Sequence, residues 1–175
     1  MAAAEPVSAA QAEALSPSLG PTMEASVSTD AVDYSVAKDA TIAVAAAETL
    51  GHYADWLGVS ASRLRQINRM KYGRPVLIGN RVKLDFSRVS EATFEQRRRD
   101  FHRSLQASYF AAHRIIGTEV YVARRGDSLW TVTQRYTRLP VWLLQQYNPD
   151  VDLSEMRAGT QIVVPRVEEV AAAGG

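Results

Sequence analysis

The chain has 175 residues and a net charge of +1, which allows one or two small domains and does not suggest strong nucleic-acid binding. It has no Cys, which excludes disulfides, thiolate metal sites and a thiol nucleophile. No apolar run approaches the roughly 18 residues of a membrane span, and the start MAAAEPVSAA lacks the basic and apolar regions of a signal peptide.

Residues 1–34 are rich in Ala, Ser, Pro and Glu, and aromatic residues are nearly absent from them. They carry no Lys or Arg and five acids: Glu5, Glu13, Glu24, Asp30 and Asp33. Such a stretch buries too little apolar surface to offset the entropy of ordering the chain. We therefore predict a disordered acidic linker here.

Residues 35–86 predict a small unit with the order strand, helix, helix, strand. The four elements are expected at 40–46, 52–57, 60–67 and 81–85. Glu48 and Thr49 are the expected caps of the first helix, and Ser60 that of the second, because short side-chain oxygens accept the free N–H groups of a first turn.

One long helix is predicted from Ser90 to about His113. Its large apolar residues recur at spacings of 7, 4 and 4 and share one stripe: Phe94, Phe101, Leu105 and Tyr109. We expect the stripe to pack within the chain, with pairing to another chain as the alternative. The arginine run 97–99 is predicted as a solvated face rather than an anion site.

The stretch 119–165 predicts the same order of elements again. A strand at 120–123 is broken by Gly126-Asp127-Ser128, which supplies backbone freedom and a helix cap. Pro140 suits the first turn of a second helix, and Pro149 stops that helix. A closing strand is expected at 161–164, and the tail after it is expected to fray.

The two units align at an offset of 79 to 80 residues, which indicates an internal repeat. The best pairs are Leu50 with Leu129, Leu64 with Leu144, Asn68 with Asn148, and Gly79 with Gly159. In the first unit Ala47 stands in place of Gly126 and Glu48 in place of Asp127.

The second unit resembles the lysin motif (LysM) family. The matching residues are Tyr121-Val122, Gly126 to Trp130, Leu144, Tyr147-Asn148-Pro149, Gly159 and Ile162 to Pro165. The resemblance implies a βααβ fold and binding of N-acetylglucosamine glycans, mainly peptidoglycan and chitin. The first unit resembles a diverged copy, whose changes put its glycan binding in doubt.

We therefore predict an α+β protein with two small βααβ lysin-motif modules joined by a long amphipathic helix. The expected boundaries are 1–34 for the disordered leader, 35–86 and 118–166 for the modules, 87–117 for the linking helix and 167–175 for a flexible tail.

The resemblance also implies which residues would line a glycan groove, between the first strand–helix loop and the second helix–strand loop. In the second unit they are Gly126, Asp127, Ser128, Leu129, Asn148, Pro149, Asp150, Val151, Arg157 and Ala158. A possible second site has Glu48, Thr49, Leu50, Asn68, Met70 and Ile78. From the residues alone, Asp127 or Ser128 could simply cap a helix, and Asn148 more simply fixes the turn after its helix.

Trp142 is predicted on the helix face away from Leu144 and Tyr147, where it could stack on a sugar, bind a protein or dock against the linking helix. Catalysis is not expected: the three His residues are isolated, and Glu48 and Asp127 are each explained as caps. No metal or cofactor is expected either.

The expected partner is a peptidoglycan strand, bound in the periplasm or cell envelope. This chain would then be a fragment or processed form, since it has no signal peptide. The alternative function is a structural or protein-interaction unit of an envelope assembly, using the linking helix or the Trp142 surface.

Overall fold

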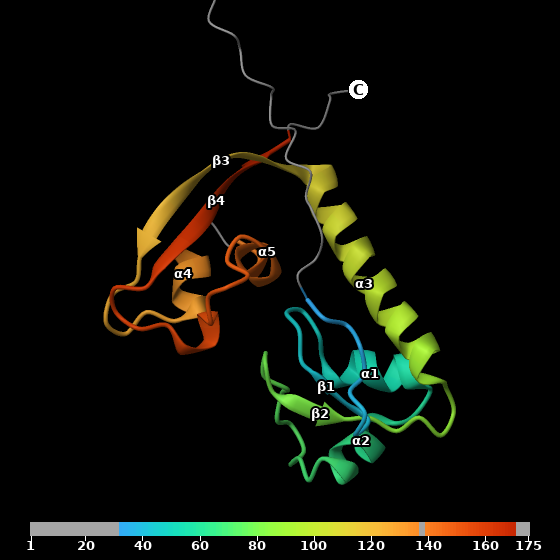
Figure 1. Cartoon of the computed structure of the whole chain (residues 1–175). Coiled ribbons are helices and arrows are strands. Elements are labelled where there is room, and N and C mark those ends of the chain that lie inside the picture. The colour runs from blue at the N-terminus through green and yellow to red at the C-terminus, as the bar shows by residue number, and fades with distance from the viewer. Residues whose placement is uncertain (1–31, 137–138, 171–175) are drawn as a thin grey trace, which may run out of the picture.

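The computed structural model describes residues 32–136 and 139–170, and it contains two small α/β units with a long helix between them (Figure 1). The first unit consists of β1 (Thr41–Ala43), α1 (Leu50–Leu57), α2 (Ala61–Ile67) and β2 (Arg81–Lys83). The second consists of β3 (His113–Val122), α4 (Leu129–Arg135), α5 (Val141–Gln146), a 3-10 turn (Leu153–Glu155) and β4 (Gln161–Glu169). The linking helix is α3 (Glu91–Ala112). The mixed α+β class is confirmed.

Each unit closes on a two-stranded antiparallel sheet made from its first and last strand. In the first unit Ile42 lies opposite Val82, and in the second Tyr121 lies opposite Ile162. The β3–β4 ribbon is the longer, because it continues past the second unit as far as the pair His113 and Glu169. In Figure 1 this ribbon arches from the end of α3 to the second unit.

Three predicted boundaries differ from the structure. The linking segment was expected to extend to 117, but β3 begins at His113, while the helix itself ends at Ala112, close to the predicted end at about His113. The flexible tail was expected from 167, but residues 167–169 pair with β3. The leader was expected to reach 34, but Tyr34 is buried and stacks on His102 at 4.6 Å between ring centroids. Residues 1–31 of the predicted leader lie outside the described residues.

The same hydrogen bonds tie the second helix to the last strand in both units. Asn68 donates to the carbonyls of Leu64 and Lys83, and accepts from the Lys83 N–H at 2.7 Å. Asn148 makes the same three bonds, to Leu144 and Val163. These partners are 80 residues apart throughout, so the sequence repeat is also a repeat of geometry.

The loop after the first strand is also built alike. Gly79 donates to the carbonyl of Val44, and Gly159 to that of Ala123, both at 2.8 Å. Ala47 has a φ of 67° and Gly126 a φ of 88°, so both loops turn through the left-handed region at the same place. Ala47 does so although a Cβ disfavours this conformation.

The apolar stripe of α3 packs within the chain, as predicted. Phe94 is fully buried in the core of the first unit, which is worth roughly 2–3 kcal/mol. Leu105, Tyr109 and Phe110 pack against the core of the second unit. One helix therefore covers part of both cores.

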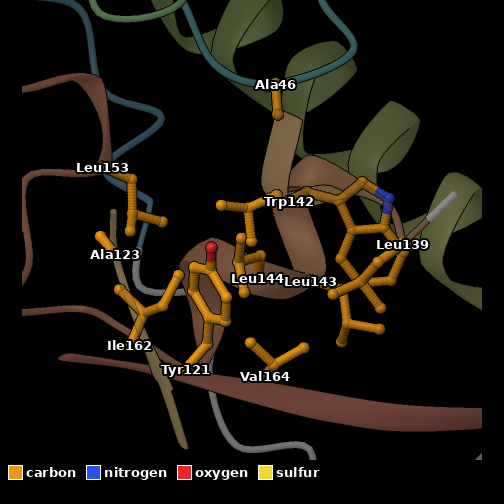
Figure 2. Close-up of a cluster of buried hydrophobic side chains, with 11 residues drawn as sticks. Ala46, Tyr121, Ala123, Leu139, Trp142, Leu143, Leu144, Leu153, Ile162 and Val164 are labelled. Carbon is orange, nitrogen blue, oxygen red and sulfur yellow. The ribbon is translucent and has the colours of Figure 1, made fainter. Parts of the chain in front are cut away.

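Trp142 belongs to the core of the second unit, which decides between the alternatives that the sequence left open. Its indole is 7% exposed and meets Tyr109 and Phe110 of α3 edge-on, with centroids 5.4 and 5.8 Å apart. Ala46, from the first unit, lies in the same cluster (Figure 2). The docking alternative is thus the observed one.

Candidate functional site

The loop between β3 and α4 is shaped by Asp127. Its Oδ2 accepts from the N–H of Arg124 at 2.8 Å and from the hydroxyl of Tyr121, and Arg135 lies 3.6 Å from its Oδ1. The Tyr121 hydroxyl, with the Arg124 N–H, holds the pKa of Asp127 below its usual value. The same bond raises the pKa of Tyr121. Asp127 therefore fixes the loop more than it faces a ligand.

Ser128 is the N-cap of α4. Its side chain accepts from the N–H of Thr131 at 3.2 Å, and the Thr131 hydroxyl accepts from the Ser128 N–H at 2.8 Å. This capping box satisfies two of the free donors of the first turn. Leu129 is half-buried against the core. Of the predicted site residues in this loop, Gly126 and Ser128 are exposed.

The loop between α5 and β4 supplies the other predicted residues. Pro149, Asp150, Arg157 and Ala158 are exposed, and Val151 is half-buried against the core. Asn148 is 5% exposed, and its amide is occupied by the three bonds described above. These bonds favour the interpretation that Asn148 fixes the turn after its helix, and its contact with a glycan stays a prediction.

The fold brings these two loops together. Ala123, which begins the first loop, exchanges hydrogen bonds with Thr160 and Gly159, which end the second. A small hollow of about 170 Å³ lies beside the second loop and is lined by Asn148, Pro149 and Val151, among others. A larger hollow of about 540 Å³, between α3 and the ribbon, contains none of the predicted residues.

Trp130 is a further candidate residue of the functional site, which the sequence analysis did not place there. It lies in the first turn of α4, directly after the first loop, and it is 67% exposed. Burial of one Trp and exposure of the other cannot be read from the residue type. The spacing along the helix does indicate exposure of Trp130, since Trp130 does not lie on the helix face shared by Val132 and Tyr136.

Residues 121–165 match the LysM domain family. The LysM domain thus covers the second unit from the middle of β3 to Pro165 of β4, and both loops of the candidate site belong to it. The family match does not extend to the first unit.

Two solved structures of spore cortex-lytic enzymes are similar to this chain. The SleL enzyme of Bacillus cereus is 17% identical over 72% of this chain, with a TM-score of 0.26. The SleL enzyme of Bacillus megaterium QM B1551 is 13% identical over 72% of this chain, with a TM-score of 0.25. This chain spans about 22% of the length of each. No curated protein sequence matches the chain.

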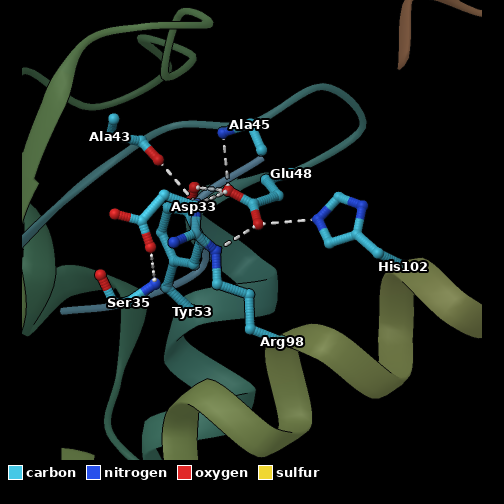
Figure 3. A network of polar contacts seen from close by, with 8 residues as sticks. All are labelled: Asp33, Ser35, Ala43, Ala45, Glu48, Tyr53, Arg98 and His102. Atoms are coloured by element: carbon cyan, nitrogen blue, oxygen red, sulfur yellow. Dashed lines mark hydrogen bonds and ion pairs between the residues drawn. The ribbon is translucent and has the colours of Figure 1, made fainter. Parts of the chain in front are cut away.

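In the first unit the predicted site is closed at Glu48. Its carboxylate is fully buried and accepts from Arg98 at 2.6 and 2.9 Å, from the hydroxyl of Tyr53 at 2.5 Å and from the N–H of Ala45 at 2.8 Å. His102 lies 2.9 Å away (Figure 3). The buried carboxylate is therefore occupied by the protein's own donors, which does not favour a contact between Glu48 and a glycan.

This network also corrects the prediction for the arginine run. Arg98 is fully buried, whereas its neighbours on α3 are exposed or half-buried. Burial opposes ionisation of Glu48, but the bonds from His102, Arg98 and Tyr53 outweigh it and lower its pKa from 4.5 to about 2. The ion pair fastens α3 to the first unit.

The other residues of the possible second site are divided between core and surface. Leu50 is buried in the core of the first unit, and Met70 packs partly on the same core. Asn68 is occupied by its three bonds to the backbone. Thr49 is exposed but caps α1 by accepting from the N–H of His52, which leaves Ile78 as a free side chain.

Within residues 32–136 and 139–170, no group of three or more His, Asp or Glu side chains is placed to hold a metal ion. Over the same ranges, no helix combines the length and the apolar character that crossing a bilayer requires.

Proposed function

We propose that the LysM domain at 121–165 binds an N-acetylglucosamine-containing glycan, with peptidoglycan as the natural ligand. The observation that carries the proposal is the family match over a unit whose two loops are held side by side. Gly126 in one loop and Ala158 in the other are exposed, so a sugar chain could reach backbone groups of both. A preformed groove suits a small ligand, which can offset little loop ordering.

We further propose that the first unit is a diverged second copy of the same module. Its support is the recurrence of the Asn68 bonds at Asn148, together with the left-handed turn shared by Ala47 and Gly126. Because Glu48 and Leu50 are buried, this copy would contribute structure rather than a second glycan groove.

The proposed role is non-catalytic and serves to hold a cell-envelope protein on the wall. Of the two acids that the repeat relates, Glu48 is enclosed, and Asp127 is bound to Tyr121 and Arg135. Release of soluble fragments from purified peptidoglycan by this chain would contradict the proposal.

The alternative role as a protein-interaction unit loses two of its proposed surfaces. Trp142 and most of the stripe on α3 are already packed inside the chain. An interaction role would need another surface.

The test is co-sedimentation with protein-free peptidoglycan, with soluble N-acetylglucosamine oligomers as competitor. Ala158→Tyr fills the exposed turn of the second loop and should abolish pelleting. Ile78→Tyr makes the same change at the matching position of the first unit and should leave pelleting intact. Pelleting that oligomers do not reverse, or that both variants lose equally, would contradict a glycan site in the LysM domain.

A further inference from the structure

The loop between α2 and β2, residues 68–80, carries an unusual combination of free cations and exposed apolar side chains. Its cations are Arg69, Lys71 and Arg74, all exposed, and it contains no acid. Within the described residues none of the three has an acidic partner. The sequence from 56 to 84 has seven cations and no acid at all.

Two tight turns project the apolar residues of this loop. Arg74 donates to the carbonyl of Lys71 and Gly73 has a φ of 75°, which together are typical of a type II turn with Tyr72 at its corner. In a second turn the N–H of Asn80 donates to the carbonyl of Leu77, and Gly79 has a φ of 84°.

The apolar side chains of the two turns lie in solvent. Tyr72 is 91% exposed, Leu77 60% and Ile78 36%. Three exposed apolar side chains within one loop are unfavourable in water, which points to a binding role for the loop.

The matching loop of the LysM domain, 148–160, has the opposite character. It has three acids, Asp150, Asp152 and Glu155, and one cation, Arg157, for a net charge of −2 against +3 in 68–80. Where the first unit presents Tyr72, the second has Asp152, and it turns Leu153 into its core. The shared fold therefore does not require the basic and apolar character of 68–80.

We propose that loop 68–80 is a docking site for the surface of an anionic lipid bilayer. Cations attract anionic headgroups, while Tyr72 suits the interface and Leu77 and Ile78 enter the acyl boundary. A neutral sugar would gain nothing from the three cations. A nucleic acid would use the cations and one aromatic ring but not the two aliphatic side chains. In Figure 1 the loop lies on the side of the first unit away from α3.

The test uses the full chain and vesicles of equal parts phosphatidylcholine and phosphatidylglycerol. Binding is expected at low salt, is expected to weaken as salt shortens the range of the charges, and should be absent with phosphatidylcholine alone. Lys71→Gln with Arg74→Gln should lower vesicle affinity about 5-fold for each charge removed. Tyr72→Ser with Leu77→Ser should also weaken it, and Arg157→Gln in the matching loop should not.

Several results would overturn the proposal. One is no binding to the anionic vesicles at low salt by a chain whose circular dichroism is native. Another is binding that Tyr72→Ser with Leu77→Ser leaves unchanged while polyphosphate or single-stranded DNA displaces it, which would assign the cations to a soluble polyanion. Because the vesicles contain no glycan, the outcome is independent of the peptidoglycan test.

Discussion

The two units place an acidic side chain at the same point of the same loop and surround it differently. In each, the carboxylate accepts from a backbone N–H three residues earlier, at Ala45 or Arg124, and from a tyrosine hydroxyl. Glu48 is then covered by Arg98 and His102 of α3, whereas Asp127 meets an arginine that is 46% exposed. The same local hydrogen bonds therefore occur in both units, but Glu48 also joins its unit to α3, whereas Asp127 stabilises only its own loop.

The largest expected effect comes from breaking the buried ion pair between Glu48 and Arg98. Glu48→Gln leaves Arg98 buried without its counter-charge and should lower the free energy of unfolding by about 3–5 kcal/mol. Asp127→Asn should cost much less, since water reaches its partners. Guanidinium titration of the two variants measures the difference, and equal losses would contradict it.

A comparable effect is expected at one of two tryptophans. Trp142→Ala should cost about 3–5 kcal/mol because it empties the contact between α5 and α3. Trp130→Ala should change the free energy of unfolding by less than about 0.5 kcal/mol because its indole lies in solvent. Urea unfolding compares them, and a strong loss at Trp130 would show that it packs on the fold.

Low pH should weaken the ion pair between Glu48 and Arg98. The folded state lowers the pKa of Glu48 from 4.5 to about 2, so its contribution is complete above pH 4.5 and is lost as pH falls toward 2. That contribution is about 3 kcal/mol at neutral pH. Unfolding curves from pH 6 to 2.5 should be steeper in pH for the wild type than for Glu48→Gln, and parallel curves would refute the assignment.

Substitution of Asn68 or Asn148, which occupy matching positions in the two units, should lower the free energy of unfolding by a smaller amount. Asn148→Ala leaves the N–H of Val163 and two carbonyls without partners and should cost about 1–3 kcal/mol. Asn68→Ala breaks the same bonds nearer to solvent and should cost less. Thermal unfolding at neutral pH ranks the two, and a larger loss at Asn68 would reverse our reading of their burial.

The smallest effect tests the shared left-handed turn. Gly126→Ala should cost about 1 kcal/mol through backbone strain alone, since nothing lies within 4 Å of the added Cβ. Ala47→Gly should relieve the same strain at the matching position. Chemical denaturation of the two variants should shift in opposite directions, and shifts of the same sign would contradict an equivalent turn.

Much of the fold was predictable because local signals dominate it. Ser60, Ser90 and Ser128 cap the helices expected of them, and the repeat located the matching strands. The ends of the β3–β4 ribbon were missed, because His113 and Glu169 carry no strand signal of their own and are held by each other. The LysM resemblance predicted which two loops would form the candidate site, but not which of their side chains are free.

The sequence by itself determined the order of elements, the caps, the turns and the presence of a LysM domain, because each depends on residues close in the chain. The tertiary structure alone decided that Glu48, Arg98 and Trp142 are interior and that Trp130 and Tyr72 face solvent. The burial of Glu48, Arg98 and Trp142 depends on where α3 lies, because it is set by partners about 50 or 30 residues away, as with Glu48 and Arg98 or Trp142 and Tyr109.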